Sequence, residues 1–98
     1  MSETACRIDV WLWRARFAKT RALAAAMVER GLVRLTHHGI QTRLDKPSRT
    51  VHVGDALVFA LGGRLLELRV LQTGERRGPP EEARALYSSV RSEPPTGG

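Results

Sequence analysis

The sequence predicts an α+β domain of two N-terminal helices, a β-hairpin, a small and mostly antiparallel sheet, and a short C-terminal helix. Apolar residues recur with helical spacing in the first third of the chain, and they alternate with polar residues from residue 33 onward. Proline and two glutamates then open a last helical segment. We expect a flexible N-terminus over 1–6, one domain over 7–90 and a disordered tail over 91–98.

The first helix is expected over 10–17, with Asp9 as its N-cap. At 100° per residue its apolar side chains form two nearly opposite faces, namely Ile8, Trp11, Leu12 and Ala15 on one and Val10, Trp13 and Phe17 on the other. A helix that is apolar on two sides is expected to lie between two other elements. We interpret Trp13 as a packing residue rather than a base-stacking platform, because Phe17 shares its face.

The second helix is predicted to begin at Thr20, its N-cap, and to end near Arg30, before Gly31. Leu23, Met27 and the alanines are expected to form its buried face. The two helices are expected to be joined by only one or two residues, which implies a sharp corner.

The rest of the domain is predicted to be a sheet and a third helix. In "LVRLT", Val33 and Leu35 point to one side and Arg34 to the other, and Thr36-His37-His38-Gly39 forms a turn. A short strand and a proline-broken loop follow, then a tight turn at 53–55 and two strands hinged at Gly62-Gly63. The core of these strands is expected from Leu57, Val58, Phe59, Leu61, Leu65, Leu66, Leu68, Val70 and Leu71.

The third helix is expected over 80–90, with Leu86, Tyr87 and Val90 as its apolar stripe. We expect it to cover the face of the first helix that carries Trp13 and Phe17.

The excess of positive over negative charge is confined to one half of the chain. Residues 7–49 hold ten basic and three acidic side chains, a net charge of +7, whereas residues 50–98 hold six of each. A field concentrated on one part of a small domain favours a polyanionic partner, with nucleic acid first and an anionic membrane surface second.

Several cations flank the start of the second helix, where the helix dipole disfavours them. Lys19 and Arg21 lie on either side of the Thr20 cap, and Arg7, Arg14 and Arg16 lie just upstream. Exposed helix amides and cations together predict a phosphate site, and the alternative is a solvated basic face. A further set of Arg34, Arg43, Lys46 and Arg49 extends this surface. Five or six phosphate contacts on single strands give a log–log salt slope of about −3.5 to −4.

Other chemistry finds little support. The single Cys6 excludes an internal disulfide framework, and no apolar run approaches the roughly 20 residues of a membrane span. His37, His38 and His52 match no compact zinc spacing and are interpreted as surface turn residues. We therefore expect no catalytic residue, metal or cofactor, and a reduced, cytoplasmic protein that is not an enzyme.

The order of motifs resembles the RNA-binding domain named after bacterial ribosomal protein S4. Its members read Arg-Leu-Asp, a basic-Ser/Thr-Arg step, Gly-x-Val and Val-x-x-Gly-Asp. This chain has Arg7-Ile8-Asp9, Lys19-Thr20-Arg21, Gly31-Leu32-Val33 and Val51-His52-Val53-Gly54-Asp55. The "WLW" segment and "RRGPPEEARALY" resemble the heat shock protein 15 family more narrowly. The resemblance spans roughly residues 7–88.

The resemblance implies an αL motif, in which two short helices and a β-hairpin grip structured RNA. It implies binding to ribosomal RNA on free large subunits that still hold a nascent chain on tRNA. The residues carried over are Arg7, Arg16, Lys19, Thr20, Arg21 and Lys46. The chain departs from the family where its histidine turn is expected to be one residue longer than the usual Asn-Gly turn. It also has only a short segment after the third helix, where some relatives carry a basic extension.

Alternative interpretations stay open at this point. The chain fits a general adaptor for structured RNA or tRNA, a DNA-binding protein, or a basic module that binds an acidic protein. Membrane binding is disfavoured because both apolar faces of the first helix are expected to be buried. We expect the free protein to be a monomer.

Overall fold

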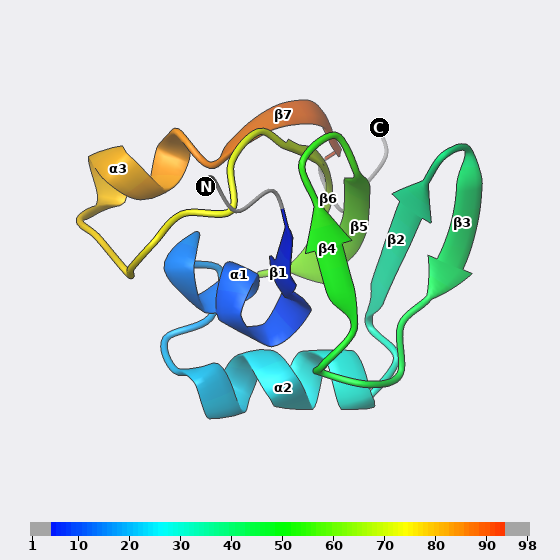
Figure 1. Ribbon diagram of the computed structural model, residues 1–98. Helices are drawn as coiled ribbons and strands as arrows, with labels where there is room; N and C mark the ends of the chain where they lie inside the picture. The colour runs from blue at the N-terminus through cyan, green and yellow to red at the C-terminus, as the bar shows by residue number, and fades with distance from the viewer. Residues whose placement is uncertain (1–4, 94–98) are drawn as a thin grey trace.

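The computed structural model describes residues 5–93, and in it two helices pack against one face of a twisted antiparallel sheet (Figure 1). The elements in chain order are β1 (Ala5–Arg7), α1 (Ile8–Arg14), α2 (Arg21–Glu29), β2 (Val33–His37), β3 (Ile40–Arg43), β4 (Thr50–His52), β5 (Ala56–Leu61), β6 (Arg64–Val70), α3 (Pro80–Arg84) and β7 (Tyr87–Glu93). This arrangement confirms the predicted α+β class. Within the described residues no helix is long and apolar enough to cross a membrane.

The strands form two separate sheets. Five strands run in the order β3-β2-β5-β6-β7 with every neighbouring pair antiparallel, and β1 pairs with β4 as a two-stranded ribbon. Ala5 lies opposite His52 and Arg7 lies opposite Thr50 in that ribbon. Ala5 and Cys6 are therefore ordered by pairing, although the sequence predicts a flexible segment through residue 6. The remainder of that segment, residues 1–4, and tail residues 94–98 lie outside the described part of the chain.

One core joins α1, α2 and the inner face of the sheet. Its largest fully buried side chains are Trp11, Phe59, Ile8, Leu12, Leu44, Leu57 and Leu68. The first predicted face of α1 is thus confirmed as the core-facing one. The second face is half-buried, and Phe17 packs against the rings of Phe59 and Tyr87 at centroid distances of 5.2 and 4.8 Å.

The C-terminal part of the domain differs from the prediction. Helix α3 ends at Arg84, and the segment from Tyr87 forms strand β7 on the edge of β6. The predicted helix over 80–90 is therefore wrong beyond its first turns. The carbonyl of Leu86 accepts hydrogen bonds from the amides of Leu71 and Gln72, at 2.8 and 3.2 Å, and this contact turns the chain from α3 into the sheet. Ladder pairing with β6 outweighs the weak local helix preference of Tyr-Ser-Ser-Val.

The connection between α1 and α2 is longer than predicted. Six residues, 15–20, separate the helices, and Arg16 among them has a φ of 67°. The buried face of α2 is confirmed in part, because Ala24 is buried and Met27 packs against the core. Leu23, however, is 52% exposed, and Val28 is buried although it was not predicted to be. The small alanine allows α2 to pack closely on α1, and this packing rotates Leu23 toward solvent. Leu61, Leu65 and Leu71, which were predicted to belong to the core of the sheet, are likewise exposed.

The turn between β2 and β3 is shorter than the sequence suggested. His37 pairs directly with Ile40, so only His38 and Gly39 form the loop. Both have positive φ, 50° and 80°, as a two-residue type I′ turn requires. The prediction that this turn is one residue longer than an Asn-Gly turn is therefore wrong. His38 takes the position at which Asn usually stands in an Asn-Gly turn.

Both ends of α2 are capped as predicted. The Thr20 hydroxyl accepts a hydrogen bond from the amide of Leu23 at 3.0 Å. At the other end the amides of Gly31 and Leu32 bond to the carbonyls of Val28 and Met27, which is a Schellman motif with Gly31 at φ 74°.

Removal of the Thr20 hydroxyl is expected to weaken α2. Thr20→Ala should lower the free energy of unfolding by about 1 kcal/mol, because the Leu23 amide loses its acceptor. Thr20→Ser keeps the hydroxyl and serves as the control. Urea unfolding followed by circular dichroism measures both, and an equal loss in the two variants would contradict the capping role.

Candidate nucleic-acid interface

Three exposed residues stand together where α2 begins. Lys19, Thr20 and Arg21 are all exposed, and the Thr20 side chain is directed at the helix as its cap. The amides of the first helical turn have no partner within the helix, and the dipole adds partial positive charge there. Two cations beside this end increase the local positive potential. The arrangement is suited to an anion with several oxygen acceptors.

Two of the predicted site residues turn toward the protein instead. Arg14 is half-buried and its Nη1 donates to the carbonyl of Gly74 at 2.8 Å and to that of Thr73 at 3.3 Å. Arg16 is exposed, but its Nε donates to the carbonyl of Gly78 at 2.8 Å. These contacts fasten the end of α1 and the connection after it to the loop before α3. We infer that Arg14 has a structural role. The Arg16 guanidinium uses one of its donors for the Gly78 carbonyl and keeps the others for a ligand.

Arg7 is held by the carboxylate of Asp9. Its Nε lies 3.1 Å from Asp9 Oδ1 and its Nη2 lies 3.0 Å from Oδ2, and the Arg7 side chain remains 51% exposed. Asp9 lies in the first turn of α1 rather than before it, so its prediction as N-cap is wrong. The N-cap residue is Arg7, which makes no side-chain capping hydrogen bond. Asp9 Oδ1 also accepts a hydrogen bond from the backbone amide of Val10. The remaining guanidinium donors of Arg7 can still contact a ligand.

The loop between β3 and β4 brings two more cations to the N-terminus of α1. The carbonyls of Arg49 and Pro47 accept the amides of Ile8 and Asp9 at 2.8 and 3.3 Å. A turn closes between Lys46 and Arg49 through a 3.0 Å bond, and both side chains are exposed. The loop backbone therefore fills the start of α1, and its charged side chains stay on the surface.

Two arginines face each other across the β2–β3 hairpin. Arg34 is the cross-strand partner of Arg43, and both are exposed. Like charges directly opposite in a sheet destabilise the free protein. Arg43 also lies against the end of α2, since a Cβ built on Gly31 would stand 3.3 Å from its Cδ.

We name as the basic surface the exposed residues around α2 and the two loops beside it, namely Lys19, Thr20, Arg21, Arg30, Arg34, Arg43, Lys46 and Arg49. Seven of them are site residues predicted from the sequence. Arg30, the C-cap residue of α2, was missed. Its position beside Gly31, where the helix ends, is the signal that could have indicated it. Helix α2 has 9 residues. At about 1.5 Å of rise per residue it is about 14 Å long, and this length separates the part of the basic surface near Lys19 from the part near Arg43.

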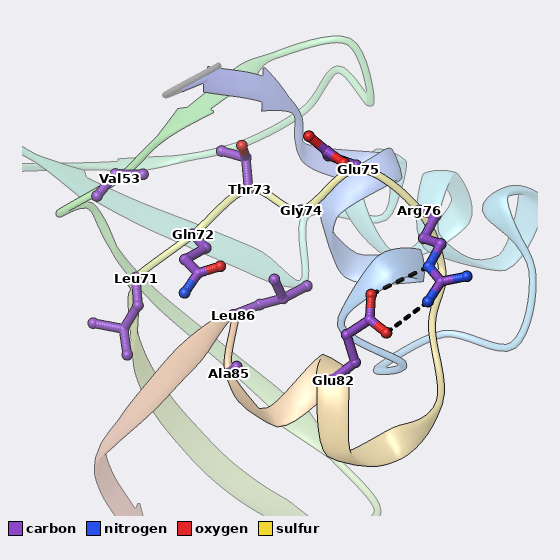
Figure 2. A pocket seen from close by; sticks show the side chains of 10 residues that line it. All are labelled: Val53, Leu71, Gln72, Thr73, Gly74, Glu75, Arg76, Glu82, Ala85 and Leu86. Carbon is purple, nitrogen blue, oxygen red and sulfur yellow. Dashed lines mark hydrogen bonds and ion pairs between the residues drawn. The ribbon is translucent and has the colours of Figure 1, made fainter. Parts of the chain in front are cut away.

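A depression beside the segment between β6 and α3 has a different character from the basic surface. It is lined by Val53, residues 71–76, Glu82, Ala85 and Leu86 (Figure 2). Arg76 donates from Nε and Nη2 to the two Glu82 oxygens at 3.2 and 3.0 Å. These hydrogen bonds and the Glu82 charge raise the pKa of Arg76 above its ordinary value. The only described guanidinium in this lining is thus paired with a carboxylate, and the depression does not extend the basic surface.

The structure also brings together two histidines that the sequence left apart. His37 and His52 both approach the buried carboxylate of Asp55. The interpretation of these histidines as unrelated turn residues missed this contact, because pairing of β2 with β5 places the hairpin tip beside the β4–β5 turn.

Comparison with known proteins agrees with this geometry. The S4 domain family matches residues 6–35, which span α1, α2 and most of β2. The chain is 38% identical over 92 residues to the heat shock protein 15 homolog of Haemophilus influenzae, and 42% identical over 84 residues to heat shock protein 15 of Escherichia coli strain K12. These alignments cover 94% and 86% of this chain. They span 66% and 59% of the two relatives.

A solved structure described as trimeric, that of Vibrio cholerae heat shock protein 15, superposes with a TM-score of 0.78 at 36% identity. The match covers 88% of this chain and 82% of that one. The family resemblance seen in the sequence motifs is thereby confirmed. The chain carries an S4 domain and belongs to the heat shock protein 15 family.

Proposed function

We propose that this chain is a non-catalytic RNA-binding protein of the cytoplasm that docks on structured ribosomal RNA of the large subunit. The observation that carries the proposal is the exposed Lys19-Thr20-Arg21 cluster at the start of α2. Cations at this position oppose the helix dipole in the free protein and gain a partner when a phosphate arrives. Membership of the heat shock protein 15 family supports ribosomal RNA as the target.

The basic surface accounts for the affinity in this proposal. Arg34 and Arg43 repel each other across the hairpin until an anion lies between or above them. Lys46 and Arg49 add cations on a loop whose backbone is fixed to α1, so little ordering is required when they bind. Sites fixed in this way favour a structured RNA of matching shape over a flexible strand.

The resemblance extends the proposal to a process. We propose that the protein acts in the recycling of large subunits, or in the rescue of those that hold a stalled nascent chain on tRNA. A tRNA contact is part of this proposal. A general adaptor for structured RNA and a module for an acidic protein partner are the competing outcomes of the test.

Sedimentation of cell extract tests the target. We expect the protein to cosediment with large subunits, to be released by RNase, and to dissociate with added salt along a log–log slope of about −4.5 to −5.5, as for five or six contacts on a duplex. Cosedimentation that survives RNase would contradict RNA as the anchor and indicate a protein partner. Equal binding to both subunits, or to free tRNA alone, would contradict the large-subunit assignment. Light scattering on the free protein separates the expected monomer from a trimer.

A further inference from the structure

We propose that His37, His52 and Asp55 form a binding site for a divalent transition-metal ion of the Zn²⁺ class. His37 ends strand β2, His52 ends β4, and Asp55 follows in the β4–β5 turn. Each residue offers one ligand atom, and the three atoms lie within 4.8 Å of one another. This site is independent of the basic surface, because none of its residues belongs to that group.

The carboxylate of Asp55 lies at the centre of the cluster. Its Oδ1 is 2.5 Å from Nδ1 of His37 and its Oδ2 is 3.6 Å from Nδ1 of His52, and the side chain is only 4% exposed. A buried carboxylate carries a large desolvation cost unless positive charge neutralises it. A divalent ion bound here would supply that charge.

An unsatisfied polar atom points to a missing ligand. Nδ1 of His52 is buried and finds no hydrogen-bond partner within residues 5–93. Its ring lies 4.9 Å from that of His37, centroid to centroid, so both imidazoles border the same carboxylate. A buried nitrogen without a partner costs free energy, and coordination to a metal would satisfy its lone pair.

The donor set suits zinc and its neighbours. Two imidazole nitrogens and one carboxylate oxygen match the three-ligand arrangement that leaves a fourth tetrahedral position open. Ligand atoms about 2.0–2.2 Å from such an ion stand about 3.4 Å apart. His37 would retreat from Asp55 by about 1 Å and His52 would approach it. Both are half-exposed side chains on a shallow depression, lined also by His38, Val53 and Gly54, from which water can complete the coordination.

The orientation of the carboxylate is already fixed. The backbone amide of His52 donates to Asp55 Oδ2 at 2.9 Å. Such outer contacts hold a ligand in place and raise metal affinity. An ion at this site would add a link between the tip of the β2–β3 hairpin and the β4–β5 turn, just beyond the last ladder pair of β2 with β5, Thr36 and Ala56.

Metal titration of the untagged, chelator-treated full chain tests the proposal. We expect one Zn²⁺ per chain in competition with a chromophoric chelator. We expect His37→Asn and His52→Asn to weaken binding at least tenfold. His38→Asn is the matched control, because His38 stacks on His37 at a centroid distance of 4.0 Å but contributes no ligand. No binding, unchanged binding in the first two variants, or an equal loss in the control would each overturn the site.

Two measurements on the unaltered protein make the test independent of mutant folding. In ¹⁵N-correlated spectra, Zn²⁺ should shift Nδ1 of His37 and His52 to metal-bound values and leave the His38 nitrogens in their free form. The Co²⁺-substituted protein should show ligand-field bands without a thiolate charge-transfer band. A thiolate band would place the ion at Cys6 and overturn the assignment, as would perturbation of His38 nitrogens alone.

Discussion

The double variant Lys19→Glu/Arg21→Glu is expected to lose about 100-fold in affinity for large-subunit RNA. Each side chain is exposed at the start of α2 and is assigned one phosphate. Hydrogen bonds to charged groups contribute about 1.5 kcal/mol or more each, and 1.4 kcal/mol corresponds to tenfold in affinity. Filter binding or fluorescence anisotropy at several salt concentrations measures the loss. The steepness of the salt dependence should also decrease by about 1.8 when two contacts to a duplex are removed.

The same variant is expected to be more stable than the natural protein. Glutamates near a helix N-terminus interact favourably with the dipole, by about 0.3–1 kcal/mol each, where the two cations interact unfavourably. Loss of binding together with a gain in the free energy of unfolding separates a functional role from damage to the fold. A structural role for these cations predicts the opposite sign, a loss of stability.

A matched charge reversal provides the control. Arg69 on the outer side of β6 and Arg84 at the end of α3 are both exposed and lie outside the basic surface. Arg69→Glu/Arg84→Glu changes the net charge by the same amount and should weaken binding far less. If the two double variants lose affinity equally, net charge alone accounts for binding, and a specific phosphate site at α2 is contradicted.

Trp11→Ala is expected to have the largest effect on stability, a loss of about 3–5 kcal/mol. Trp11 is fully buried, and its Nε1 donates to the carbonyl of Gln72 at 2.9 Å. Its ring also borders those of Phe17 and Tyr87, at centroid distances of 6.1 and 6.4 Å. Truncation therefore leaves a cavity at the meeting point of α1, the loop after β6 and strand β7. The total free energy of unfolding of a natural domain is only about 5–15 kcal/mol, so this loss is a large share of it.

Thermal unfolding by circular dichroism measures the Trp11 effect, with about 4–8 °C of Tm lost per kcal/mol. Trp13→Ala is the natural control, because Trp13 lies two residues away on the same helix but is only half-buried. We expect a clearly smaller loss there. Equal losses in the two variants would contradict the assignment of Trp11 as the central packing residue.

Many features encoded within a few residues were predictable from the sequence, although the N-cap assigned to Asp9 and the length of the histidine turn were not. The Thr20 cap, the Gly31 helix end and the alternation of Val33, Arg34 and Leu35 depend on local geometry, and the structure has all of them. Features that depend on distant partners were not predictable. Tyr87 joins a strand because β6 presents an open edge to it.

The same distinction applies to the candidate site. Exposure of Lys19 and Arg21 follows from their place beside the cap, so the sequence pattern suffices to identify them. The inward direction of Arg14 depends on carbonyls about 60 positions away, in the loop before α3. The meeting of His37 with Asp55 likewise depends on the pairing of β2 with β5. No spacing rule within one segment contains that information.

The way in which α1 begins has a consequence for the order of folding. Its first amides are bonded to the carbonyls of Arg49 and Pro47, which are some forty residues later in the chain. Seven residues are too few for a helix that is stable alone in water. During synthesis, α1 therefore leaves the ribosome early but acquires its hydrogen-bond partners only after the β3–β4 loop has emerged. The β2–β3 hairpin, whose two strands pair across a two-residue turn, can form before it. We expect the amides of α1 to gain protection late in pulse-labelling hydrogen exchange, together with those of β4.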